Sequence, residues 1–187
     1  MPSGEIQTDA IVRHALGEGK QVFVPYLHKS QLDIPDTPSR VMDMVHLKSL
    51  QDYESLQLDR WGIPSIDPST VPDRQRILGG SEAFHSEKSA LDLILLPGVA
   101  FDLDEAGAVR RLGHGKGFYD FFLNRYLSRM ASSTEAKTEL RLYALALSDQ
   151  FISKSDDHSV PTGPYDRRLD GLILGDGQVK VFEEKDR

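Results

Sequence analysis

Helical and strand-like spacings of apolar residues alternate along the chain. The first helical spacing covers residues 6–16, where Thr8 is placed to cap the start of a short helix. The β-branched and aromatic run at 21–26 follows and predicts a strand that Pro25 stops. Residues 41–47 alternate between apolar and polar positions and predict a second strand. The chain is thus predicted to begin with a helix that is followed by two strands.

The most apolar stretch lies in the middle of the chain. Residues 91–101 form a continuous apolar run, which predicts a central parallel strand buried on both faces. A long loop over 98–117 is expected next, and apolar residues from Tyr119 to Met130 then recur at helical spacing. Further short strands are predicted at 141–147, 171–175 and 179–182, with the last two joined as a hairpin.

This alternation of strands and helices predicts an α/β sandwich whose sheet is mainly parallel. The length of 187 residues and the 39% hydrophobic content are those of a single globular domain over residues 1–187. Ligands of such sheets bind beyond the carboxyl ends of the strands, which is where the loop at 98–117 should lie.

Composition and charge narrow the classes of function. The chain has no cysteine, which excludes disulfides, thiolate catalysis and cysteine-ligated metals. A net charge of -7 argues against a nucleic-acid partner bound through a basic surface. No apolar stretch approaches the ~20 residues of a membrane helix, and the N-terminus lacks the features of a signal peptide. We therefore expect a cytoplasmic protein with no nucleic-acid or membrane partner.

The segment "RLGHGKGFYD" at 111–120 carries the candidate chemistry. Its three alternate glycines permit backbone N–H groups to surround an anion, and the helix that follows adds its partial positive charge. Basic donors on the same stretch favour a polyphosphate; they are Arg110, Arg111, His114 and Lys116. A solvated glycine-rich turn with an incidental basic face explains the spacing equally well, because the segment matches neither the P-loop nor the dinucleotide fingerprint.

Carboxylates near this segment are candidate magnesium ligands. Asp120 lies one helical turn into the predicted site, where it could hold the ion beside a phosphate or only favour the helix N-terminus by ~0.3 to 1 kcal/mol. Asp166 and Asp170 are four residues apart, and one of them could join the metal; otherwise both are turn and surface residues. Glu5 is either an acidic contact on a loop or an N-terminal charge.

Two motifs in sequence give the chain a specific resemblance. "LDLILLPGVAFD" followed by "RLGHGKGFYDFFLNRY" resembles the 5-formyltetrahydrofolate cyclo-ligase family, also called 5,10-methenyltetrahydrofolate synthetase. The family's PG-x-x-F-D turn and its R-L-G-x-G-x-G-[FY]-Y-D loop occur here in the right order. The resemblance continues in "MPSGEI", "GKQVFVP", "WGIPSIDP" and "VP…YDRRLDGLI", so it covers nearly the whole chain. It implies a three-layer α/β sandwich akin to ribose-5-phosphate isomerase and the CoA-transferases.

The resemblance also implies an activity and its residues. ATP would phosphorylate the formyl oxygen of 5-formyltetrahydrofolate, with or without a polyglutamate tail, N10 would attack, and phosphate would leave to give 5,10-methenyltetrahydrofolate. By position, the implied ATP contacts are Arg111, Leu112, Gly113, His114, Gly115, Lys116, Gly117, Phe118 and Tyr119, with Arg111, Lys116 and Tyr119 catalytic. The implied folate contacts are Glu5, His114, Gly115, Lys116, Gly117 and Phe118, and the implied magnesium ligands are Asp120 and Asp166.

The start of the chain departs from the family pattern. Family members carry a basic K-x-x-L-R helix and a first strand before the M-P-x-G-E segment, and the sequence begins at Met1 where that strand would end. The alternative function is therefore a catalytically impaired folate- or nucleotide-binding relative. The family's monomer would then be open to association through an exposed sheet edge, and a mitochondrial form is the alternative to the cytoplasmic one.

Overall fold

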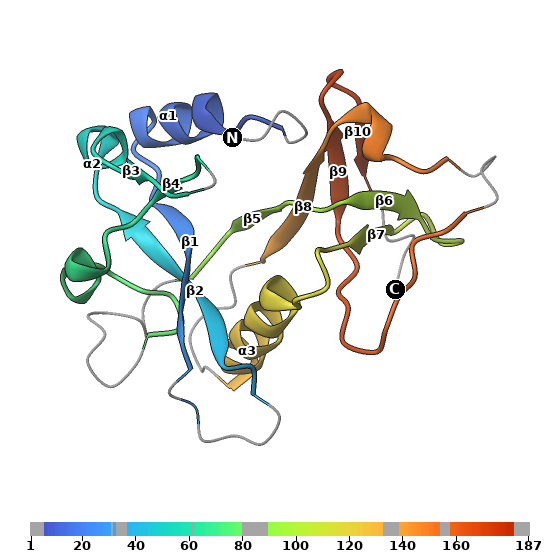
Figure 1. Ribbon diagram of the computed structural model, residues 1–187. Helices are drawn as coiled ribbons and strands as arrows, with labels where there is room; N and C mark the ends of the chain where they lie inside the picture. The colour runs from blue at the N-terminus through green and yellow to red at the C-terminus, as the bar shows by residue number, and fades with distance from the viewer. Residues whose placement is uncertain are drawn as a thin grey trace. The chain divides into compact units, whose positions relative to one another are not determined.

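The computed structural model describes residues 6–30, 32, 37–60, 62–79, 90–132, 139–153 and 158–181 (Figure 1). The chain divides into two compact units, unit 1 built mainly from Gln7–Ala90 and unit 2 mainly from Leu91–Arg187. The single domain expected from the chain length stays a prediction.

Unit 1 is organised around a two-stranded antiparallel sheet. Its buried cluster joins the sheet to the segment after it and consists of Val45, Leu47, Ile66 and Val71. The elements of unit 1 are α1 (Asp9–Gly17), β1 (Val22–Lys29), β2 (Arg40–Leu47), α2 (Leu50–Glu54), β3 (Gln57–Leu58), β4 (Pro64–Ser65) and the 3₁₀ helix η1 (Pro68–Asp73). The predicted first helix and the strand at 41–47 are confirmed, although Thr8 makes no side-chain capping hydrogen bond at the start of α1.

Strand β1 continues through Pro25 to Lys29, so the prediction that Pro25 stops it is wrong. Pro25 lies opposite Met44 in the antiparallel pair of β1 and β2. The Met44 carbonyl accepts a hydrogen bond of 2.9 Å from the Ile77 N–H, so the backbone groups of Met44 point away from β1. Pro25 therefore needs no N–H at this position, and a proline is tolerated within the strand.

Unit 2 contains a mixed four-stranded sheet with the strand order β10-β9-β8-β5. β5 pairs with β8 and β8 with β9 in parallel, while β9 and β10 form the predicted antiparallel hairpin. The elements are β5 (Leu93–Leu96), β6 (Ala100–Leu103), β7 (Val109–Leu112), α3 (Phe118–Ser132), β8 (Arg141–Ala146), the 3₁₀ helix η3 (Ser148–Gln150), β9 (Gly171–Leu174) and β10 (Val179–Val181). The α/β class is confirmed, and the three-layer sandwich stays a prediction.

The apolar run at 91–101 is divided between two strands, which corrects two predictions. β5 is an outer strand of the described sheet, and Leu93 is 52% exposed whereas Leu96 is buried, so β5 is not buried on both faces. The expected loop at 98–117 contains the antiparallel hairpin of β6 and β7. The chain turns at Gly98, where a Cβ atom would lie 2.6 Å from the Phe101 ring, so only glycine lets this buried ring pack there.

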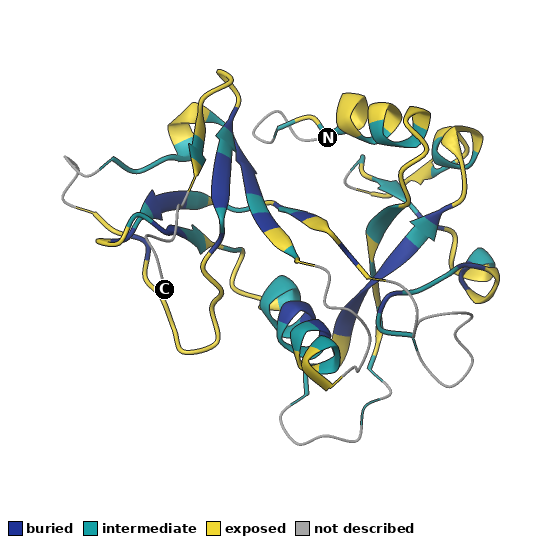
Figure 2. Ribbon diagram, turned by 180° about the vertical axis from the view of Figure 1, so that it is seen from behind, coloured by how far each residue is buried: buried dark blue, intermediate teal, exposed yellow. Residues whose placement is uncertain are grey.

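Helix α3 begins directly after the glycine-rich segment, as the sequence predicts. Phe122, Leu123 and Tyr126 form its buried face, which Figure 2 shows in dark blue. The Tyr126 hydroxyl accepts a hydrogen bond of 2.7 Å from the Leu91 N–H, which ties the helix to the start of the apolar run. Within the described ranges, no helix is long and apolar enough to cross a membrane.

Candidate functional site

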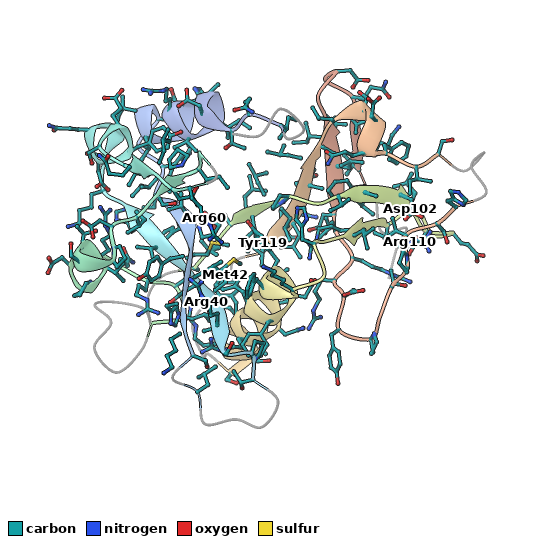
Figure 3. The ribbon with its side chains drawn as sticks, in the orientation of Figure 1. Arg40, Met42, Arg60, Asp102, Arg110 and Tyr119 are labelled. Carbon is teal, nitrogen blue, oxygen red and sulfur yellow. The ribbon has the colours of Figure 1, made fainter. Side chains whose placement is uncertain are left out.

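A buried ion pair joins the two strands of the β6–β7 hairpin. Asp102 on β6 is 4% exposed and accepts two hydrogen bonds from Arg110 on β7, from Nε at 2.7 Å and from Nη2 at 2.5 Å. Figure 3 shows the two side chains on their neighbouring strands. The hydrogen bonds from Arg110 to Asp102 raise the pKa of the guanidinium above its usual value, so Arg110 stays charged. The basic donor expected at Arg110 is thus already bound to a carboxylate.

The same carboxylate holds a second segment in place. The Val160 N–H donates a hydrogen bond of 2.9 Å to Asp102 Oδ2. Further along, the Leu169 N–H donates to the Val109 carbonyl at 2.9 Å. We call residues 158–170 the closing segment, because both ends of it are fastened to the hairpin. The part between these two contacts carries Asp166.

A cleft of about 190 Å³ lies between the hairpin and the closing segment. Small-molecule pockets usually measure about 300 to 1,000 Å³, so this cleft has room for one part of a ligand, such as a phosphate group. Arginines and aspartates make up most of its walls. The lining residues are Asp104, Arg110, Arg111, Thr162, Gly163, Asp166, Arg167 and Arg168. Two of the predicted site residues, Arg111 and Asp166, are therefore brought together.

Arg111 links the cleft to the start of helix α3. Its Nη2 donates to Asp120 Oδ2 at 2.6 Å, and its Nη1 donates to the Pro97 carbonyl at 3.3 Å. The guanidinium carbon also lies 5.7 Å from the centre of the Tyr119 ring. Arg111, Tyr119 and Asp120, which the sequence places in one site, thus form one contact group.

Comparison with known proteins shows the family of the chain. The family model described as the 5-formyltetrahydrofolate cyclo-ligase family matches residues 1–175. The chain belongs to this family. It is 33% identical over 181 residues to "Probable 5-formyltetrahydrofolate cyclo-ligase" of Caenorhabditis elegans, covering 97% of this chain and 72% of the relative.

Two fungal relatives agree with this membership. The "Probable 5-formyltetrahydrofolate cyclo-ligase" of Schizosaccharomyces pombe is 30% identical over 180 residues, which cover 96% of this chain and 74% of the relative. The "5-formyltetrahydrofolate cyclo-ligase" of Saccharomyces cerevisiae is 29% identical over 184 residues, which cover 98% and 76%. The resemblance read from the motifs is therefore confirmed, and the chain belongs to a family of enzymes.

The glycines of the family motif form an exposed loop ahead of α3. Gly115 and Gly117 adopt positive φ angles of 76° and 63°, as expected for a loop whose N–H groups turn inward. His114, Gly115, Lys116 and Gly117 are exposed, and none of them lines the cleft. The remaining motif residues flank them: Leu112 ends β7, Gly113 follows it, and Phe118 begins α3 half-buried.

The two candidate magnesium ligands are held by the protein itself. Asp120 accepts its hydrogen bond from Arg111, and Asp166 Oδ2 accepts one of 2.7 Å from the Gly163 N–H. Among the residues that the structure describes, no three histidines or carboxylates gather into a metal cluster. Magnesium is commonly bound through one or two protein carboxylates together with substrate phosphates, and each of these aspartates keeps a second carboxylate oxygen for such a role. Glu5 lies outside the described residues.

Sequence reasoning missed several residues of the cleft, among them Asp104, Arg167 and Arg168. It also gave no role to Asp102, although this residue belongs to the PG-x-x-F-D motif. Arg168 Nε lies 3.1 Å from Asp104 Oδ2, in an ion pair without hydrogen-bond geometry. Arg167 and Arg168 meet partners that are far away in the sequence, Asn124 and Asp104, so no local spacing marks these two arginines. The only local feature that could have marked these two arginines is that they stand side by side directly after Asp166.

Proposed function

We propose that the chain converts 5-formyltetrahydrofolate and ATP into 5,10-methenyltetrahydrofolate, ADP and phosphate. Membership of the cyclo-ligase family, together with the contact group of Arg111, Tyr119 and Asp120 beside the cleft, carries the proposal. In this reaction the formyl oxygen attacks the γ-phosphorus, and the bond from that phosphorus to ADP breaks. N10 then attacks the former formyl carbon and gives up its proton, and phosphate leaves with the oxygen.

The exposed glycine loop is proposed to bind the phosphates. Its backbone N–H groups and the N-terminus of α3 offer partial positive charge, and Lys116 adds a full charge where negative charge develops on the transferred phosphoryl group. Arg111 contributes a second cation while it orients Asp120. Phosphorylation matters because an amide-like oxygen is a poor leaving group, whereas phosphate is a good one.

Asp120 and Asp166 are proposed to hold magnesium between them and the ATP phosphates. The ion supplies neutralisation of phosphate charge. Asp120→Asn keeps the shape of the side chain but weakens it as a ligand for a hard cation. We expect the magnesium concentration needed for half-maximal rate to rise, or activity to vanish, whereas an Asp120 that only favours the helix end would leave that concentration unchanged. Asp166→Asn should act in the same direction.

The proposed folate contacts are assigned from the positions of residues in the family motifs. Glu5 and the residues from His114 to Phe118 are proposed to contact the folate, and the reaction is proposed to take place in the cytoplasm in a monomeric enzyme. Localising a tagged chain in its native cell tests the cytoplasmic assignment.

The activity is tested with the full chain, ATP, magnesium and 5-formyltetrahydrofolate. We expect the absorbance of the methenyl product to rise and one ADP to form for each product molecule. ATP binding without product would favour the catalytically impaired relative instead. A chain that binds neither ATP nor 5-formyltetrahydrofolate would contradict both functions.

A further inference from the structure

Four arginines line the cleft, and their partners differ in charge. Arg110 faces Asp102, Arg111 faces Asp120, and Arg168 faces Asp104, so three of the four meet a carboxylate. Arg167 instead donates from Nε, at 2.7 Å, and from Nη2 to the side-chain oxygen of Asn124 on α3. A carboxamide carries no net charge. Arg167 thus keeps its full positive charge at the cleft.

Asn124 also fastens the backbone beside Arg167. Its Nδ2 donates to the Tyr165 carbonyl at 3.3 Å, so one side chain binds residues on both sides of Asp166. The amide therefore orients the guanidinium through two contacts that converge on its one oxygen, and it fixes the turn that carries Asp166. An aspartate would hold the guanidinium equally well but would cancel its charge. A neutral acceptor orients the arginine and leaves it more attractive to an anion than a carboxylate partner does.

We propose that Arg167 binds an oxygen of the nucleotide's phosphate chain in this cleft, and that Asn124 is the positioning residue that aims it without neutralising it. The inference rests on the proposed function, because Arg111 and Asp166, which line the same cleft, are the residues proposed to meet ATP and its magnesium. The size of the cleft agrees with a phosphate group and not with a whole nucleotide. Arginine is suited to this role because its planar fork matches two phosphate oxygens.

The decisive variant is Asn124→Asp in the full chain. It has nearly the same size and keeps the acceptor for Arg167, but it places a negative charge beside the guanidinium and loses the donor to the Tyr165 carbonyl. Ser128→Asp is the matched control, because Ser128 is exposed, lies one helical turn further along α3, and gains the same charge. Arg167→Gln removes the cation itself. Dissociation constants for ATP and for inorganic tripolyphosphate are measured by titration calorimetry, and folding by the midpoint of urea unfolding.

We expect Arg167→Gln to weaken ATP and tripolyphosphate binding by about 10- to 100-fold, the worth of one charge-assisted hydrogen bond. Asn124→Asp should weaken both by about tenfold, and Ser128→Asp by less than about twofold, since an exposed charge further away is screened by solvent. The urea midpoint of Asn124→Asp should fall only slightly, because its new ion pair with Arg167 offsets the exposed hydrogen bond that the carboxylate can no longer donate to the Tyr165 carbonyl. If Asn124→Asp and Arg167→Gln bind both ligands as the wild type does, the charge of Arg167 plays no part in binding and the proposal is overturned.

Two further measurements distinguish a phosphate site at Arg167 from a site for folate carboxylates, and a failure of this inference from a failure of the proposed function. Binding of mono- and polyglutamylated 5-formyltetrahydrofolate without ATP should be unchanged in Asn124→Asp. A loss confined to the polyglutamylated folate would assign Arg167 to carboxylates and overturn the phosphate assignment. The tripolyphosphate titration needs no turnover, so a wild type that binds this probe through Arg167 but forms no methenyl product would contradict the proposed function alone. A productive wild type whose Arg167 variants keep full affinity would contradict the inference alone.

Discussion

The glycine loop at 113–117 and the closing segment at 158–170 are built in opposite ways. The glycine loop is largely exposed, and two of its glycines occupy the left-handed region. The closing segment is fastened by Asp102 near its start, by Asn124 in its middle and by Val109 near its end. The conformation of the glycine loop therefore depends on its own residues. The position of the closing segment depends on residues that are distant from it in the sequence.

Because of this difference, substitutions in the two segments should affect ligand affinity and the free energy of unfolding separately. Substitution of the buried fastening residue Asp102 should lower the free energy of unfolding of unit 2, because it leaves buried polar groups without partners. Substitutions in the glycine loop should change ligand affinity while the fold survives, because few contacts are lost there. The four predictions below follow this order, from the largest expected loss of unfolding free energy to the smallest.

Asp102→Asn should have the largest effect. Whichever way the amide is turned, its NH₂ group faces a donor: Arg110 Nε in one orientation, and both Arg110 Nη2 and the Val160 N–H in the other. We expect the free energy of unfolding in urea to fall by about 2 to 4 kcal/mol, as for other buried pairs that lose one partner. Glu139→Gln is the control, because it breaks the exposed pair with Arg141 and should cost no more than about 1 kcal/mol. Equal losses in both variants would show that the buried carboxylate does not fasten the hairpin.

Gly98→Ala should follow. The new methyl group would lie 2.6 Å from the Phe101 ring and 3.0 Å from the Leu112 carbonyl, and Phe101 is fully buried. Overpacking of this kind costs about 1 to 3 kcal/mol, which urea unfolding measures. Gly17→Ala at the end of α1 meets nothing within 4 Å and should be neutral or slightly stabilising. A Gly98→Ala variant as stable as Gly17→Ala would mean that the Phe101 ring can move aside freely.

Local signals in the sequence account for what could be predicted. The spacing after Tyr119 predicted α3, and the motif around Gly115 predicted the loop and the family. Pro25 misled because its effect depends on whether the neighbouring strand needs an N–H, which the sequence of β1 does not reveal. The β6–β7 hairpin was missed because Asp102 and Arg110 stabilise it through an ion pair between its strands, so polar residues occupy buried positions.

Long-range pairs explain the part of the candidate site that the sequence could not provide. Asn124 and Arg167 are 43 residues apart, and neither lies in a pattern that marks the other. The contact of Asp102 with the Val160 N–H spans 58 residues and uses a backbone group that every residue but proline possesses. The sequence could therefore name Arg111, Asp120 and Asp166 through the family motif, but it could not show that a cleft brings Arg111 and Asp166 together.

Gly115→Ala tests whether the glycine loop needs its backbone conformation. Gly115 has a φ of 76° with nothing within 4 Å of a new Cβ atom, so the cost is conformational and not steric crowding. We expect the free energy of unfolding to fall by about 1 kcal/mol and ATP affinity to fall with it. Gly115→Asn should lose less in both, because asparagine tolerates the left-handed region better than alanine. If alanine and asparagine behave alike, the positive φ is not what the loop requires.

Lys116→Ala should leave stability almost untouched and still weaken binding. Lys116 is exposed, so its truncation should change the free energy of unfolding by no more than about 0.5 kcal/mol. If its ammonium group meets the phosphates, ATP affinity should fall by about 10-fold or more, because a charge-assisted hydrogen bond is lost. Lys20→Ala removes an equally exposed charge after α1 and should change neither quantity. Titration calorimetry and urea unfolding of the two variants decide the matter: a Lys116→Ala chain that binds ATP as Lys20→Ala does would leave the loop an exposed turn, with its basic face incidental and the phosphates bound elsewhere.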